Sequence, residues 1–165
     1  MPRIGVVGSA PAGAASVELV ARGIQDALAE LPVSQLVGVT CLEPGFDLVL
    51  AQGILAAHGT LIAVAPSWDY HARIVDAAER ATCESVLRQA AAVHVMPFPT
   101  ITPETCYAAR YHLLKMVQAL VVVIGDGSAG PSPELAEVVA AAGGRRLPVI
   151  VARPDQSDVD RHVAS

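Results

Sequence analysis

The feature that most constrains this chain is a regular alternation of short apolar runs with longer segments of helical periodicity. The apolar runs lie at residues 3–8, 36–41, 61–65, 93–96, 120–124 and 148–151, and the helical patterns at 16–31, 46–58, 70–92, 102–118 and 133–142. Strands that are apolar throughout are buried on both faces, and helices between strands imply parallel pairing. The pattern predicts a Rossmann-like, doubly wound α/β fold. We expect a mostly parallel sheet of about six strands with helices on both faces.

Local capping signals mark where several of these helices begin and end. Ser16 is placed to cap the first helix, and the Thr102-Pro103 pair combines a capping hydroxyl with proline at the first helical position. Gly59 and the Gly143-Gly144 pair are expected to stop the helices that precede them. The chain has 165 residues, which suits one domain. We expect that domain to span 1–154 and the polar segment 155–165 to be a C-terminal tail.

Composition excludes several classes of protein. Apolar residues make up 53% of the chain and charged residues 16%, which excludes intrinsic disorder. The net charge is −5 and there is no basic stripe, so nucleic acid is not expected as a partner. No apolar run reaches the ~18 residues that a membrane-spanning helix needs, so no membrane association is expected either.

Cysteine and histidine usage argues against a disulfide framework and against a metal site. The three cysteines are an odd number without CxxC spacing, and the five histidines have no ligand spacing. The N-terminus enters a predicted strand at once, which leaves no room for a signal peptide. We therefore expect a cytoplasmic protein with no metal and no cofactor.

A small-residue loop follows the first predicted strand. Gly8, Ser9, Ala10 and Gly13 let the backbone approach a ligand, and the N-terminus of the next helix favours an anion. A plain turn between strand and helix explains the same residues, and the loop does not match GxGxxG. In an open α/β sheet the ligand lies outside the carboxyl ends of the strands, where this loop is expected.

The second candidate segment follows the second predicted strand. Gly45 supplies a tight turn, and Asp47 lies in the first turn of the next helix, where it can face ligand hydroxyls or simply compensate the helix dipole. Cys41, at the end of the strand, is interpreted as a buried structural thiol. Pro66 and Tyr70, after the third strand, are candidates for the rim of the pocket.

The third candidate segment is a glycine-rich loop after the most hydrophobic strand. We expect Gly125, Asp126, Gly127 and Ser132 to contact the ligand. Glu134 and Glu137 lie one turn apart on the following helix, so that both carboxylates share a face. Glu137, and less so Glu134, is the candidate catalytic carboxylate, although an acidic first turn is common in helices. Arg110, on the helix before this strand, is expected to be solvated or to face a second copy.

Several of these segments resemble the SLOG superfamily, Rossmann-like domains related to SMF/DprA and to the LOG phosphoribohydrolases. The similarity covers residues 3–153 and includes RIGVVGSA, ALVVVIGDG and AEVVAAAGGRRLPVIVAR. The most specific parts are Pro44-Gly45-Phe46-Asp47 and Pro66-Ser67-Trp68-Asp69-Tyr70. The resemblance implies binding of a nucleotide-derived ligand at the carboxyl edge of the sheet. LOG members cleave the N-glycosidic bond of nucleoside monophosphates.

This chain departs from the family pattern at two places that bear on catalysis. Gly8-Ser9-Ala10 stands where related members often have Gly-His-Arg, and residues 129–137 depart from the LOG motif Pro-Gly-Gly-x-Gly-Thr-x-x-Glu except at the final Glu137. Pro131 and Pro133 remove N–H donors from that loop. These departures favour a domain that binds a nucleotide or a nucleotide-derived small molecule. The alternatives are a LOG-like N-glycosidase and a non-catalytic partner subunit, and Ala-rich segments at 90–92 and 108–116 predict a homodimer in each case.

Overall fold

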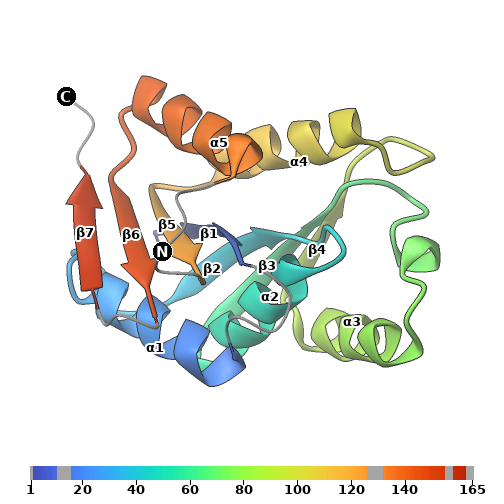
Figure 1. Cartoon of the computed structure of the whole chain (residues 1–165), viewed down its shortest axis with the longest axis horizontal. Coiled ribbons are helices and arrows are strands. Elements are labelled where there is room, and N and C mark those ends of the chain that lie inside the picture. Colours follow the sequence, from blue (N-terminus) through green and yellow to red (C-terminus); the bar gives the residue numbers. More distant parts are fainter. Residues whose placement is uncertain (1, 11–15, 126–131, 155–157, 163–165) are drawn as a thin grey trace.

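A computed structural model describes residues 2–10, 16–125, 132–154 and 158–162 of the chain. Its strands form one sheet in the order β4-β3-β2-β1-β5-β6-β7 (Figure 1). The strands are β1 (Ile4–Ser9), β2 (Val37–Cys41), β3 (Thr60–Ala65), β4 (Ala92–Val95), β5 (Ala119–Ile124), β6 (Val149–Arg153) and β7 (Asp158–His162). The helices are α1 (Val17–Leu28), α2 (Phe46–Ala56), the short 3-10 helix η1 (His71–Arg73), α3 (Ala77–Gln89), α4 (Pro103–Met116) and α5 (Pro133–Gly144).

The sheet reverses its winding direction at β1. From β1 the chain builds outward through β2, β3 and β4, then returns through α4 to place β5 on the other side of β1. The pairs from β4 to β6 are all parallel, which confirms the Rossmann-like α/β prediction. A seventh strand, which the sequence analysis did not predict, pairs antiparallel with β6. It lies within 155–165, the segment that was expected to be a tail.

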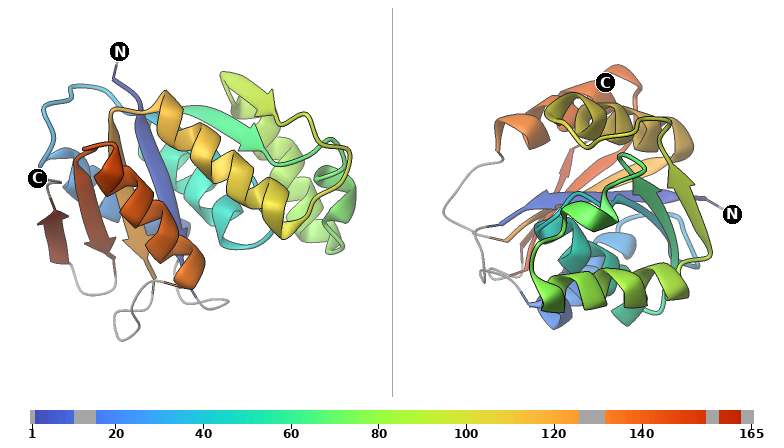
Figure 2. Two further views of the ribbon diagram at one scale, coloured as in Figure 1. Left: turned by 90° about the horizontal axis from the view of Figure 1, so that it is seen from above. Right: turned by 90° about the vertical axis from the view of Figure 1, so that its right-hand side faces the viewer.

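Two layers of helices cover the two faces of the sheet (Figure 2). On one face, α1, α2 and α3 bury a core that includes Ile24 and Leu50. On the other face, α4 and α5 bury a second core that includes Leu113 and Val138. The central strands β1 and β5 contribute to both cores, because their alternate side chains point to opposite faces. This arrangement leaves the carboxyl ends of the strands at one open edge.

The capped starts of α1 and α4 are confirmed, but the helical pattern at 70–92 divides into η1 and an α3 that begins only at Ala77. Two helix ends also differ from expectation. The Ser16 hydroxyl accepts a hydrogen bond from the Leu19 N–H, and Thr102 forms a reciprocal capping box with Thr105. After α2 the left-handed residue is His58 rather than Gly59, and α5 continues through both glycines to a left-handed Arg146. Tertiary packing, rather than glycine alone, therefore sets where these helices end.

The outer strand β4 is less buried than an apolar strand was expected to be. Its two valines, Val93 and Val95, are 39% and 45% exposed. β4 is the last strand of the sheet on its side, so one of its edges has no neighbouring strand. Among the residues that the structure describes, no helix is long and apolar enough to cross a membrane.

Candidate functional site

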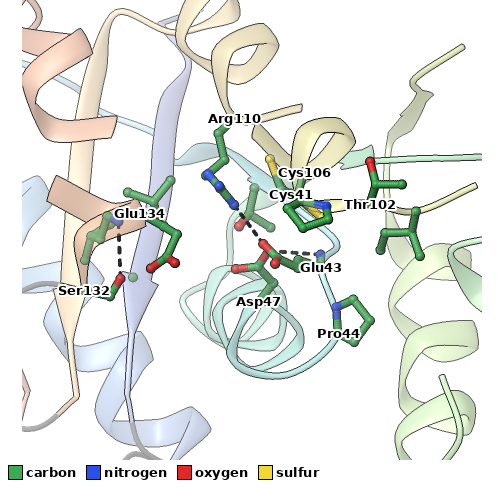
Figure 3. Close-up of a pocket in the computed structure, with 15 residues that line it drawn as sticks. Cys41, Glu43, Pro44, Asp47, Thr102, Cys106, Arg110, Ser132 and Glu134 are labelled. Atoms are coloured by element: carbon green, nitrogen blue, oxygen red, sulfur yellow. Dashed lines mark hydrogen bonds and ion pairs between the residues drawn. The ribbon is translucent and has the colours of Figure 1, made fainter. Parts of the chain in front are cut away.

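A cavity of about 620 Å³ opens at the carboxyl ends of β1 and β2, between the first turns of α4 and α5 (Figure 3). It lies beside the point where the strand order reverses, where ligands of open α/β sheets bind. The residues that line it are Val7, Gly8, Thr40, Cys41, Glu43, Pro44, Asp47, Ile101, Thr102, Pro103, Cys106, Arg110, Ser132, Glu134 and Leu135. They come from four separate segments of the chain, so only the folded chain assembles the cavity.

Gly8 forms part of the cavity wall, and no larger residue fits at that position. A Cβ atom there would overlap the carbonyl oxygen of Val123 on β5 and would lie 3.0 Å from the Phe46 ring. The glycine therefore allows β1, β5 and the start of α2 to pack closely. Its role here is in packing, and the cavity wall at this point is backbone.

Asp47 lies on the α2 side of the cavity and holds the loop that precedes its own helix. Its Oδ2 accepts a hydrogen bond from the Glu43 N–H at 3.0 Å. Gly45, between the two, has a φ of 111°, and its N–H donates to the Glu79 carboxylate on α3 at 3.0 Å. Burial, together with the nearby Glu43 carboxylate, raises the pKa of Asp47 to about 7, although the Glu43 N–H and Arg110 act in the opposite direction.

Arg110 is the single cation among the described residues that line the cavity. Its Nη1 donates to Glu43 Oε2 at 2.9 Å, and its side chain is 15% exposed. The Nε atom is buried and has no hydrogen-bond partner among the residues that the structure describes. A buried N–H donor without a partner is costly, so this atom marks a place where a ligand acceptor would be stabilised. Figure 3 shows the guanidinium reaching from α4 toward Glu43 and Asp47.

Arg110 was expected in solvent or at a contact with a second copy, but it lines the cavity and its side chain is largely buried. Cys106 and Arg110 are four residues apart on α4, and both face the cavity. This spacing puts them on one face of the helix, next to the buried Ala109 and Leu113. An arginine beside a buried face was the signal that could have identified it.

Two cysteine thiols, Cys41 on β2 and Cys106 on α4, also line the cavity. Burial is the main cause that raises the pKa of Cys41 well above its usual value, and the Asp47 carboxylate adds to it. Burial and the Glu43 carboxylate raise the pKa of Cys106 to about 12. Both groups therefore remain protonated near neutral pH and are poor nucleophiles. For Cys41 this agrees with the expected buried thiol.

The wall formed by the start of α4 is tied to the loop after β3 through Asp69. Its Oδ1 accepts hydrogen bonds from the Ser67 hydroxyl at 2.7 Å and from the Ile101 N–H at 2.9 Å. Its Oδ2 accepts from Arg73 Nε at 3.0 Å. The Ser67 hydrogen bond is the main cause that lowers the pKa of Asp69. Asp69 thus positions Ile101, which lines the cavity, without lining it itself.

The structure brings only some of the predicted site residues to the cavity. Those that line it are Gly8, Asp47, Ser132 and Glu134. Those that are described but do not line it are Ser9, Ala10, Gly45, Pro66, Tyr70, Gly125 and Glu137. Gly13, Asp126 and Gly127 lie outside the described residues.

Three of these placements have clear physical reasons. Tyr70 is buried in the core beneath α1–α3, and burial raises its pKa to about 12. Pro66 is also buried and follows β3, which is separated from the β1/β5 switch by β2. Glu134 and Glu137 are both exposed, but Glu137 lies one turn further along α5 and does not line the cavity. Glu134 is therefore the acidic residue of α5 that reaches the cavity.

Comparison with known proteins places the fold but no family. No protein-family model matches the chain, and no curated protein matches its sequence. A solved structure of DNA processing protein A from Helicobacter pylori matches 94% of this chain and 70% of its own, with a TM-score of 0.60 and 11% sequence identity. At this identity the likeness establishes a shared Rossmann-like fold.

The same comparison corrects one expectation from composition. The work that describes the Helicobacter protein concerns its binding of single-stranded DNA, so this fold is compatible with nucleic acid. The exclusion of nucleic acid from the acidic charge balance was therefore wrong. Backbone N–H groups and helix N-termini can contact phosphates without a basic stripe, so net charge is a poor guide at such a sheet edge.

Proposed function

We propose that the cavity between α4 and α5 binds a nucleotide or a nucleotide-derived small molecule. The observation that carries the proposal is the Arg110 guanidinium, a partly buried cation with an unpartnered Nε, at the ligand edge of a Rossmann-like sheet. A volume of about 620 Å³ lies within the usual range for small-molecule sites. Membership of the SLOG superfamily, suggested by the sequence motifs, is part of this proposal. The fold shared with DNA processing protein A supports it.

In this proposal Arg110 holds the phosphate. A guanidinium presents a planar fork of donors that matches phosphate oxygens, and one of its donors, Nε, is unused. The first turns of α4 and α5 line the same cavity, and the positive ends of their helix dipoles favour an anion there. Phosphate recognition then requires neither the basic residue nor the glycine loop that the family pattern has and this chain lacks.

The carboxylates on the cavity wall suit the rest of a nucleotide. Glu43, Asp47 and Glu134 present acceptors, and ribose hydroxyls and the amino groups of bases are donors. Glu43 and Glu134 are each partly open to solvent, where a single acidic residue would be ordinary. Here they lie around one cavity with a single cation, which makes an organic ligand with several donors a better match than a bare anion.

The N-glycosidase alternative is supported by Glu134. A carboxylate near the ribose can stabilise positive charge that develops as the glycosidic bond breaks. Glu134 lines the cavity and Glu137 does not, so Glu134 is the carboxylate that we propose for this role. Binding without hydrolysis remains the primary proposal, because the only cation available for the phosphate is already paired with Glu43.

The test is isothermal titration calorimetry with AMP, CMP, GMP, UMP and a ten-nucleotide single strand of DNA. We expect at least one mononucleotide to bind, and Arg110→Gln to weaken that binding by about tenfold or more, since a charged hydrogen bond contributes roughly 1.5–3 kcal/mol. Arg22→Gln, which makes the same change on the exposed surface of α1, is the matched control and should bind like the wild type.

Two results would overturn the proposal. One is the absence of mononucleotide binding by a folded wild-type protein. The other is binding that Arg110→Gln leaves unchanged, which would place the ligand elsewhere. Binding of the DNA strand alone would instead favour a nucleic-acid role for the same edge of the sheet.

A further inference from the structure

We propose that an anionic ligand group enters this cavity together with a proton, which the Asp47 carboxyl takes up. The inference rests on the proposed function, because it concerns the same cavity, and it adds a regulation of that site by pH. It is drawn from how charges are placed around the cavity, and each step below uses groups that the structure describes.

The first step is the charge of the cavity. Among its described lining residues, the carboxylates are Glu43, Asp47 and Glu134, and the only cation is Arg110. With every group ionised, the cavity carries more negative than positive charge before any ligand arrives. A phosphate would add to this excess in a partly enclosed space, where like charges repel more strongly than in water.

The second step is that Arg110 cannot neutralise all three carboxylates. Its Nη1 is bound to Glu43 Oε2 at 2.9 Å, and if its remaining donors turn to a ligand phosphate, none is left for Asp47. Within the described part of the chain, the only hydrogen bond to the Asp47 side chain comes from the Glu43 backbone N–H. That bond is compatible with a neutral carboxyl, whose carbonyl oxygen still accepts it.

The third step concerns mobility and surroundings. The Glu43 side chain is 44% exposed and can turn its charge toward water, whereas Asp47 is half-buried in the first turn of α2. The other groups that face Asp47 are Cys41 on β2 and Arg110 and Cys106 on α4, with Glu134 on α5 across the cavity. Both thiols retain their protons, so they neither accept the incoming proton nor supply positive charge.

Asp47 is therefore the carboxylate that loses its charge, by taking up a proton, when an anion binds. In the empty cavity its pKa is already about 7, mainly because of burial. A phosphate nearby disfavours the charged carboxylate further and raises this pKa again, so binding draws a proton onto Asp47. By linkage, the affinity for the anion then falls as pH rises above 7.

The experiment measures anion affinity between pH 6 and pH 8. The probe is the methyl ester of AMP, because its phosphodiester keeps one fixed charge, whereas the second ionisation of a phosphate monoester falls near pH 6. We expect wild-type affinity to be weaker at pH 8 than at pH 6 by up to about tenfold, the limit set by linkage when the ligand raises the pKa of Asp47 from about 7 to well above 8. Calorimetry in buffers of different ionisation enthalpy should show net proton uptake on binding at pH 7.

Asp47→Asn is the decisive variant, since the amide is neutral and its oxygen still accepts the Glu43 N–H. We expect it to bind at pH 8 about as tightly as the wild type does at pH 6, with little change across the range. Asp26→Asn, an identical change on the exposed surface of α1, should retain the wild-type pH dependence.

The outcomes separate this inference from the proposed function. If no mononucleotide or ester binds at any pH, the proposed function fails. If the ligand binds with the same affinity and no proton uptake from pH 6 to pH 8, the function stands and this inference is overturned. A pH dependence that Asp47→Asn leaves intact also overturns it. If Asp47→Asn does not fold, or if AMP binds and its ester does not, the test is the number of protons that the wild type takes up when AMP binds, corrected for the ionisation of AMP. Net uptake at pH 7 supports the inference, and no uptake overturns it.

Discussion

Arg110 and Glu43 are 67 residues apart in the sequence, yet Nη1 of the arginine lies 2.9 Å from Oε2 of the glutamate across the mouth of the cavity. The pair joins α4 to the loop after β2, and so links the two helix layers at the ligand edge of the sheet. Glu43 occupies the guanidinium from within the protein. An incoming phosphate must share Arg110 with it or displace it.

The first prediction follows from this competition. Glu43→Gln removes the internal charge from Arg110, and we expect AMP affinity to rise about twofold to fivefold, the range for loss of one partly exposed ion pair. The free energy of unfolding should change by less than about 1 kcal/mol, because the Glu43 side chain is 44% exposed. Calorimetry measures the affinity, and Glu18→Gln, at an exposed position of α1, is the control. Unchanged or weaker AMP binding would show that Glu43 does not compete.

The second prediction concerns stability and pH. The pKa of Asp47 is raised in the folded protein from 3.8 to about 7, so the folded state binds more protons than the unfolded state between these values. Its contribution to stability therefore falls as pH rises from about 4 to about 7. We expect the free energy of unfolding of Asp47→Asn to exceed that of the wild type by about 1–2 kcal/mol at pH 8 and to equal it at pH 4. This value is smaller than the full pKa shift would give, because Asp47 is only half-buried. Urea denaturation at both pH values measures this difference in stability. A variant that is more stable than the wild type at pH 4 but not at pH 8 would contradict the prediction.

The third prediction concerns the thiols. Cys41 and Cys106 line a cavity that is open to small molecules, but burial raises both pKa values, that of Cys106 to about 12. We expect iodoacetamide at pH 8 to label the native protein far more slowly than the urea-unfolded protein, because the thiolate is the reactive form. Mass spectrometry of a labelling time course is the measurement. Rapid labelling of Cys41 or Cys106 in native protein would indicate an activated thiol.

The fourth prediction addresses hydrolysis. We expect slow or absent release of free base from AMP, CMP, GMP and UMP, because the phosphate is held by one arginine that Glu43 already engages. A weak hold on a remote phosphate lowers turnover as well as affinity. Chromatography of the products from wild type, Glu134→Gln and Glu137→Gln provides the test. Fast release that one variant abolishes would establish the N-glycosidase alternative and identify its carboxylate.

The fifth prediction is the homodimer. Leu113 and Leu114 on α4 are covered by the sheet of the same chain, so we place the contact with a second copy at β4, where Val93 and Val95 are exposed on an edge strand. We expect light scattering at micromolar concentration to give about twice the chain mass of 17.0 kDa. Val95→Lys should give a monomer. Val75→Lys, at a valine that is 91% exposed in the loop before α3, should remain dimeric, and a wild-type monomer would contradict the prediction.

Much of the fold could be predicted because its signals are local. The apolar runs and helical periods determine the order of strands and helices along the chain. Ser16 and Thr102 each accept a hydrogen bond from the N–H three residues later, so these caps need only local sequence. The same reasoning selected Gly8, Asp47, Ser132 and Glu134, which line the cavity, because each lies at or after the carboxyl end of a strand and these ends meet at one edge. Periodicity did not find β7, since Asp158–His162 is a polar strand that pairs with the free edge of β6.

Tertiary structure decided the character of the site. Arg110 and Cys106 belong to α4, which follows the outermost strand β4 but crosses back over β2 and its neighbours on the way to β5. Only the strand order, with β5 paired to β1, brings that helix above the cavity and sets its arginine against Glu43. The sequence by itself determined which chemical groups the chain contains and which segments carry them. Packing determined which groups share a partly enclosed space, and that proximity is what couples the charge of Arg110 to Glu43 and raises the pKa of Asp47.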